Sequence, residues 1–148
     1  MILVDTSVWI DHLRQGDAGL AAALQAGAVG MHPFVVGELA CGNLRARVEV
    51  LALLQSLPPV PLATESEVLY FIDTHGLMGR GIGYIDALLL ASSRLAGAAL
   101  WTRDKRLRAV ATNSRWPMLK RSTEDSNSRP FSPAPGCHLR LLLLSLCR

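Results

Sequence analysis

The sequence predicts an α/β fold with a mainly parallel central sheet. Three short apolar runs, at residues 1–4, 28–31 and 98–102, are typical of buried strands, and longer segments with helix signals separate them. The hydrophobic content of 50% is enough for a substantial core, and a length of 148 residues fits one domain.

The first strand leads into a helix that we expect at residues 6–14, where apolar side chains recur at helical spacing. Asp17 is a suitable N-cap for a second, shorter helix, which Gly27 ends. The strand at residues 28–31 follows directly.

Pro33 suits the first turn of a helix that continues to residue 41. An amphipathic helix is expected at residues 45–57, because apolar residues recur there at three-residue spacing. The proline-rich residues 58–61 end it, and residues 60–63 are predicted to form a short edge strand.

Thr64 and Glu67 form a capping box that opens the next helix. A glycine-rich loop at residues 76–83 separates it from a strongly apolar helix at residues 84–96. After the last strand, Asp104 can cap a helix at 105–111.

Four acidic residues lie in or beside apolar segments: Asp5, Glu38, Asp86 and Asp104. Carboxylates are rarely buried without a partner, and no Lys or Arg lies within helical reach of Glu38 or Asp86. Two such charges ~4 Å apart repel by about 4 kcal/mol at an effective dielectric of ~20. A group of them therefore indicates a bound divalent cation.

The predicted topology can bring these four acids together. Asp5 and Asp104 each follow a strand, and functional groups of α/β proteins collect at the carboxyl edge of the sheet. Glu38 lies within about two turns of the same edge. Asp86 opens a helix that runs antiparallel to the last strand, so it also starts near this edge. Hard oxygen ligands favour Mg²⁺ or Mn²⁺ over zinc, and such a site suits phosphodiester hydrolysis.

Neighbouring polar residues can support this chemistry. Thr6 or Ser7 is placed to orient a metal-bound water, and Arg80 or Arg103 is placed to pair with a substrate phosphate.

The acids also have simpler interpretations. Asp5 and Asp104 are good helix N-caps, and Glu38 alone can point to solvent. Asp86 is harder to explain in this way, because Ile85 and residues 88–90 leave little polar face.

Two other functions fit parts of the pattern. One is a metal-dependent phosphatase on an α/β sheet, although Asp5-Thr6-Ser7 lacks the second Asp of the motif DxDx[TV]. The other is a non-catalytic RNA-binding module, which would not need all four acids.

The charge is unevenly distributed. Residues 1–112 carry nine Lys/Arg and ten Asp/Glu, a net charge of −1, whereas residues 113–148 carry six and two, a net charge of +4. Nucleic-acid contacts of residues 1–112 must therefore depend on local Arg placement and metal charge.

The three cysteines lack CxxC spacing, which disfavours a zinc site, and Cys41 is expected in the core. No signal peptide or membrane span is predicted, and a cytoplasmic location is expected.

The segments that contain the four acids strongly resemble the PIN domain, and within it the VapC-type toxins of bacterial toxin–antitoxin pairs. The matching segments, at residues 4–10, 36–39, 85–91 and 100–104, also have the expected order and separations. The resemblance covers residues 1–112.

This resemblance implies a Rossmann-like three-layer α/β/α sandwich and a Mg²⁺- or Mn²⁺-dependent endoribonuclease. By position, the metal-binding and catalytic residues are Asp5, Glu38, Asp86 and Asp104. Thr6 and Thr102 match polar positions that support the site. Family members usually form homodimers, and a small antitoxin inhibits them by covering the active site with its C-terminal segment.

The domain is expected to comprise residues 1–120. Family members usually end with one more strand, but residues 114–119 are a poor strand because they include Pro117. Residues 122–136 are rich in Ser and Pro, and residues 139–147 are rich in Leu. Residues 121–148 are therefore predicted to be a tail outside the domain.

Overall fold

Three short parallel strands form the central sheet of the protein. The structure is a computed structural model that describes residues 1–112, so the predictions for residues 114–119 and 121–148 lie outside the described residues. The strands are β1 (Ile2–Val4), β2 (Val29–Gly30) and β3 (Ala99–Trp101), in the order β2-β1-β3. β1 is central, with Leu3 opposite Gly30 on one side and Leu100 on the other. The predicted parallel sheet is confirmed.

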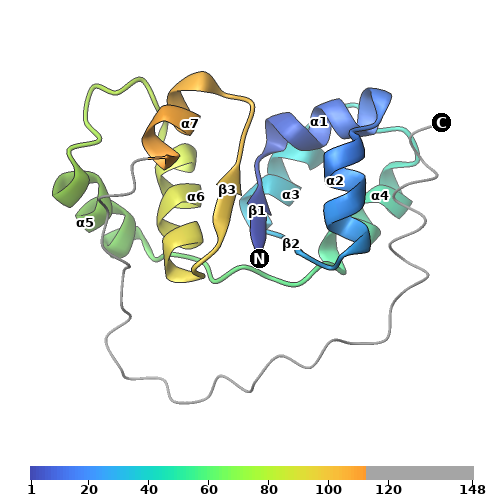
Figure 1. Cartoon of the computed structure of the whole chain (residues 1–148), viewed down its shortest axis with the longest axis horizontal. Helices are drawn as coiled ribbons and strands as arrows, with labels where there is room; N and C mark the ends of the chain where they lie inside the picture. The colour runs from blue at the N-terminus through green and yellow to red at the C-terminus, as the bar shows by residue number, and fades with distance from the viewer. Residues whose placement is uncertain (113–148) are drawn as a thin grey trace, which may run out of the picture.

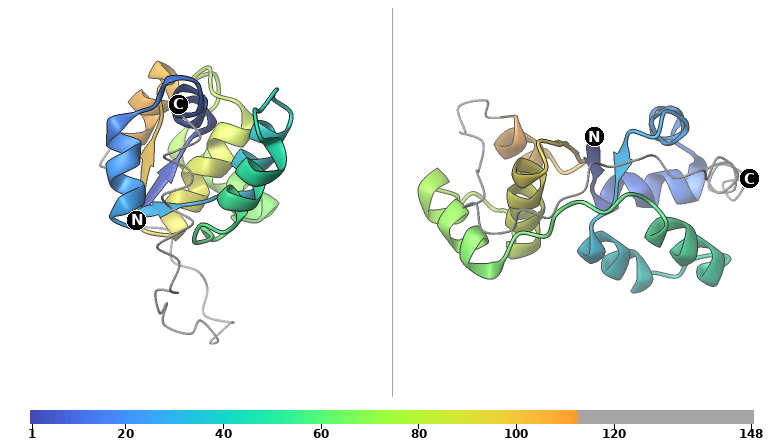
Figure 2. Two further views of the ribbon diagram at one scale, coloured as in Figure 1. Left: turned by 90° about the vertical axis from the view of Figure 1, so that its right-hand side faces the viewer. Right: turned by 90° about the horizontal axis from the view of Figure 1, so that it is seen from below.

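Helices cover both faces of this sheet. Within residues 1–112 the helices are α1 (Thr6–Gln15), α2 (Ala18–Gln25), α3 (Pro33–Ala40), α4 (Arg47–Gln55), α5 (Glu65–His75), α6 (Tyr84–Leu95) and α7 (Lys105–Ala111). Figures 1 and 2 show α2 and α7 on one side of the sheet, and α6 with the α3–α4 pair on the other. This arrangement agrees with the predicted α/β fold. None of the described helices is long and apolar enough to cross a membrane.

Two hydrophobic clusters fill the space between the sheet and the helices. One lies around β1 and the helices α1 to α4, and includes Leu3 and Trp9. The other lies between α5, α6 and α7, and includes Phe71 and Leu107. Helix α6 contributes to both clusters, because its buried residues occupy most of its circumference. The helix that carries Asp86 is thus rigidly held at the centre of the molecule.

Several helix starts use the predicted capping residues. The Asp17 side chain accepts a hydrogen bond from Leu20 N at 2.9 Å at the start of α2. Thr64 and Glu67 form the capping box of α5. Pro33 occupies the first turn of α3. These local signals were sufficient to position the helices that flank the sheet.

Three local predictions were wrong. Residues 60–63 do not form an edge strand, since the chain here makes only an isolated bridge between Met31 and Pro59. Pro61 has no N–H to extend that pairing. Helix α4 starts at Arg47 rather than at residue 45, after Ala46 with φ of 47°. Cys41 is exposed at the end of α3 rather than in the core.

Candidate active site

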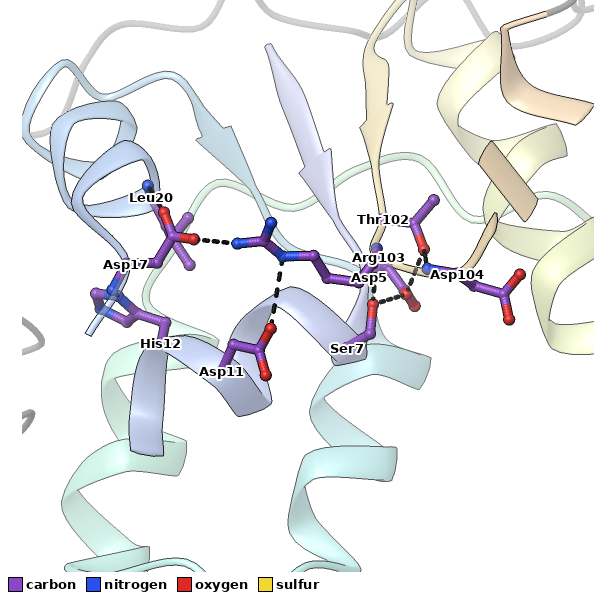
Figure 3. A network of polar contacts seen from close by, with 9 residues as sticks. All are labelled: Asp5, Ser7, Asp11, His12, Asp17, Leu20, Thr102, Arg103 and Asp104. Atoms are coloured by element: carbon purple, nitrogen blue, oxygen red, sulfur yellow. Dashed lines mark hydrogen bonds and ion pairs between the residues drawn. The ribbon is translucent and has the colours of Figure 1, made fainter. Parts of the chain in front are cut away.

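The carboxyl ends of β1 and β3 meet and place Asp5 near Asp104. Asp5 N donates a hydrogen bond to the carbonyl of Trp101 at 2.9 Å, which joins the two strand ends. Figure 3 shows the connected side chains that continue from this point. The sequence prediction that these two acids share one edge of the sheet agrees with this geometry.

Asp5 is buried, with 8% of its surface exposed, and two hydroxyl groups hold it. Its Oδ2 accepts hydrogen bonds from Ser7 Oγ at 2.5 Å and from Thr102 Oγ1 at 2.8 Å (Figure 3). Although Asp5 occupies the N-cap position of α1, its side chain makes no capping bond. The capping interpretation therefore does not explain this carboxylate.

Asp104 does cap a helix. Its Oδ1 accepts from Arg106 N at 2.7 Å and from Leu107 N at 2.9 Å, at the start of α7. The Leu107 N–H, the Arg106 N–H and the Arg106 charge lower the pKa of this carboxyl, and the first has the largest effect. Asp104 N also donates to Thr102 Oγ1 at 3.0 Å, so Thr102 links Asp5 to Asp104.

Asp86 lies in the first turn of α6 and is partly buried. Its Oδ2 accepts from Gly83 N at 2.8 Å. Burial raises the pKa of this carboxyl above its usual value, and the negative charges of Asp5 and Asp104 raise it further, against the opposing effect of the Gly83 N–H. Asp86 is therefore within electrostatic range of both other aspartates.

Glu38 is exposed on α3 and is joined to the site through Thr6, whose Oγ1 donates to Glu38 Oε2. It also lines a cavity of about 360 Å³ between α1, α3 and the start of α4. Glu38 is thus connected to the residue that follows Asp5 in the chain.

The four carboxylates share one property. In each, every side-chain hydrogen bond within residues 1–112 goes to a single oxygen, and the second oxygen has no hydrogen-bond partner in that range. Such groups are fixed in orientation and still have an oxygen with which to bind a cation. Hard oxygen donors of this kind suit Mg²⁺ or Mn²⁺.

The carboxylates do not converge on one point. Within the described part of the chain, no three Asp, Glu, His or Cys side chains lie close enough to ligate a single ion. Mg²⁺ is commonly held by one or two carboxylates, with water and substrate phosphate as its other ligands. The residues present therefore fit a magnesium or manganese site in their donor chemistry, without forming a closed cage.

Arg103 and Arg80 differ in their surroundings. Arg103 pairs with Asp17 and, at 3.5 Å, with Asp11, so two carboxylates occupy its guanidinium (Figure 3). Arg80 lies on the loop before α6, and its Nε donates to Gly76 O at 3.1 Å. Of the two predicted phosphate-binding residues, Arg103 is therefore engaged by carboxylates, whereas Arg80 forms no ion pair within residues 1–112.

The sequence did not reveal the pairing of Arg103 with Asp11 and Asp17, which are distant from it along the chain. It also missed that Ser7 Oγ accepts from Arg103 N at 3.1 Å and so ties the β3–α7 loop to α1. A serine two residues after a buried aspartate is a weak signal for this link.

The fold and the site together define an α/β protein with an acidic site at the carboxyl edge of a parallel sheet. Its aspartates lie at the ends of β1 and β3 and at the start of α6. The chain belongs to the PIN domain family, whose pattern matches residues 2–113. Within that family it is similar to Ribonuclease VapC32 of Mycobacterium tuberculosis, strain ATCC 25618 / H37Rv. The identity is 51% over 115 residues, which are 77% of this chain and 93% of the relative. The protein of the same name from strain CDC 1551 / Oshkosh gives the same values. The predicted PIN domain of VapC type is confirmed.

Proposed function

We propose that the protein is a divalent-metal-dependent endoribonuclease and the toxin of a type II toxin–antitoxin pair. The PIN domain and the similarity to Ribonuclease VapC32 support hydrolysis of RNA over the phosphatase and the non-catalytic RNA-binding module. The observation that supports a metal site is shared by the four carboxylates. In each, one oxygen accepts hydrogen bonds that orient the group, and the other oxygen is available to a cation.

Asp5, Glu38, Asp86 and Asp104 would hold the ion between them, one or two carboxylates as direct ligands and the others through its water ligands. When bound, Mg²⁺ or Mn²⁺ lowers the pKa of a water ligand and stabilises the negative charge that develops at the attacked phosphate. Asp5 supplies a carboxylate whose direction Ser7 and Thr102 fix. Thr6 orients Glu38 in the same way. Burial and the charges of Asp5 and Asp104 raise the pKa of Asp86, and a bound cation would offset the repulsion between these charges.

The experiment that tests this function is an RNA cleavage assay with the purified protein in Mg²⁺, in Mn²⁺ and in EDTA. We expect internal cleavage with either ion, none in EDTA, and recovery when excess Mg²⁺ is restored. Release of phosphate from small phosphomonoesters without RNA cleavage would favour a phosphatase. RNA binding without cleavage under any condition would favour a binding module.

Loss of the Thr102 hydroxyl should weaken the site without removing a charge. Thr102→Val keeps the size of this buried residue but removes the donor to Asp5. Loss of a group that orients a metal ligand typically costs 10- to 100-fold in metal affinity or activity, so the Mg²⁺ concentration for half-maximal cleavage should rise by roughly that factor. Thr112→Val is the control, because Thr112 is exposed and its hydroxyl, within residues 1–112, bonds only carbonyls of its own helix. Equal Mg²⁺ dependence in both variants would contradict the assigned role.

The resemblance also indicates partners. We propose that the protein forms a homodimer, that an antitoxin inhibits it by covering the carboxylates, and that it acts in the cytoplasm, where its RNA substrate is found.

A further inference from the structure

Three cationic side chains line a cavity beside the candidate active site. Arg80 comes from the loop before α6, and Lys105 and Arg106 come from the first turn of α7. The cavity has a volume of about 380 Å³, and Ala109 and Val110 complete its lining. All three cationic side chains are exposed, so a ligand can reach them from solvent.

The loop packs closely against Arg106. Gly81 has φ of +71°, and a Cβ at this position would lie 3.0 Å from Arg106 Nη1 and 3.1 Å from its Cδ. Arg106 Nη1 donates a long hydrogen bond of 3.5 Å to Gly81 O. Arg80 is held by its bond to Gly76 O. Contacts with the loop backbone therefore orient both arginines, which keep further N–H groups for a ligand.

None of these cations forms an ion pair within residues 1–112, although the charge of Arg106 is near enough to act on Asp104. Both ion pairs formed within residues 1–112 belong to Arg103, which leaves Arg80, Lys105 and Arg106 without a carboxylate within 4.0 Å in that range. Three neighbouring positive charges repel each other, and a bound anion would relieve this repulsion. The cavity is also close to the metal-binding carboxylates, since the Arg106 backbone N–H donates to Asp104.

We propose that Arg80, Lys105 and Arg106 form a binding site for a backbone phosphate of the RNA, adjacent to the phosphate that is cleaved. This proposal rests on the proposed ribonuclease function. Residues 1–112 have a net charge of −1, which includes the four carboxylates of the candidate active site, so a local cationic site would favour the approach of RNA. The two guanidinium groups favour phosphate, which they can bind through paired N–H donors.

The test compares two double variants of the full chain. Arg80→Gln with Arg106→Gln removes both arginines of the site, whereas Arg47→Gln with Arg108→Gln removes the same charge from residues that do not line this cavity. Binding of a fluorescent single-stranded RNA is followed by anisotropy in EDTA at several salt concentrations. The six Lys/Arg of residues 113–148 are present in both variants, so their contribution to binding cancels.

We expect the first variant to lose one or two phosphate contacts. The slope of log K against log salt should then decrease by about 0.7 to 1.4, which is a weakening of roughly 5- to 25-fold at 0.1 M salt. The control variant should keep affinity and slope close to wild type. Equal losses in the two variants would overturn the proposal, because net charge would then explain the binding.

Two further measurements sharpen this result. Gly81→Ala leaves the charge unchanged but displaces Arg106, so it should also weaken RNA binding, and a thermal unfolding curve checks that the variant is folded. An acidic peptide is the second probe: if the site variant loses the peptide but keeps RNA, the cavity binds a protein partner and the proposal is wrong. RNA binding is measured in EDTA and needs no catalysis. If the protein does not cleave RNA, the binding comparison still tests the phosphate site, so the failure of this proposal can be distinguished from the failure of the ribonuclease function.

Discussion

Asp86→Asn should reduce RNA cleavage at least ~100-fold and leave the fold intact. Asn keeps the shape of the side chain and can still accept the hydrogen bond from Gly83 N, but it lacks the charge that binds a cation. Loss of a group that only orients a metal ligand already costs up to ~100-fold, so loss of a ligand should cost at least as much. The measurement is the initial rate of RNA cleavage in saturating Mg²⁺.

The stability of the metal-free protein should change in the opposite direction. The pKa of Asp86 is raised by burial and by the charges of Asp5 and Asp104, so its ionised form destabilises the fold near neutral pH. Asp86→Asn should therefore raise the melting temperature in EDTA. Asp73→Asn, at an exposed position on α5, is the control and should change neither cleavage nor melting. If Asp86→Asn cleaves RNA at the wild-type rate, the assignment of Asp86 to the active site is wrong.

The second large effect concerns acid stability and is expected at His32. This residue is fully buried between β2 and α3, and burial lowers its pKa from 6.5 to about 4. Its Nδ1 accepts from Phe34 N at 3.2 Å, and its Nε2 lies 3.2 Å from Ser92 Oγ. The neutral ring can therefore donate through Nε2. Protonation would place a hydrogen on Nδ1, opposite the Phe34 N–H, and break the capping bond.

The sign of the pH effect follows from this shift. Between pH 6.5 and pH 4 the unfolded chain binds a proton at His32 and the folded chain does not, so acid favours unfolding. At about 1.4 kcal/mol per pH unit, the free energy of unfolding should fall by about 3 kcal/mol over this interval and level off below it. Burial also lowers the pKa of His12 and His75, which adds a loss of the same sign.

Chemical denaturation at several pH values measures this contribution. His32→Asn can keep an acceptor for Phe34 N but does not titrate. Between pH 6.5 and pH 4, its free energy of unfolding should therefore fall by about 3 kcal/mol less than that of the wild type. His75→Asn is the comparison variant at the end of α5, where the side chain is only partly buried, and it should reduce the pH dependence by less than His32→Asn does. Parallel pH curves for wild type and His32→Asn would contradict the assignment.

The fold was largely predictable because its signals are local. Apolar runs placed the three strands, and Asp17, Pro33 and Thr64 marked helix starts that the structure confirms. The edge strand at residues 60–63 failed because pairing is a long-range property, and proline removes the donors that would sustain it. Local apolar content could not reveal this.

The site was predictable only in part. The acids stood out because each interrupts or follows an apolar segment, and parallel topology places the ends of β1 and β3 side by side. The way each carboxylate is held was not visible. Thr102 and Asp5 are 97 residues apart, and the pairs of Arg103 also join distant segments. Such contacts depend on the tertiary fold, and no spacing in the sequence encodes them.

The proposed function depends on the binding of a divalent cation at the carboxyl edge of the sheet, where one or two of the four carboxylates would ligate it directly. Titration with Mn²⁺, followed by the electron paramagnetic resonance signal of the free ion, tests it most directly, because it needs neither RNA nor catalysis. We expect saturable Mn²⁺ binding by wild type and by Asp73→Asn, competition by Mg²⁺, and binding at least ~100-fold weaker in Asp5→Asn and Asp86→Asn. Equal Mn²⁺ binding by all four proteins would contradict it.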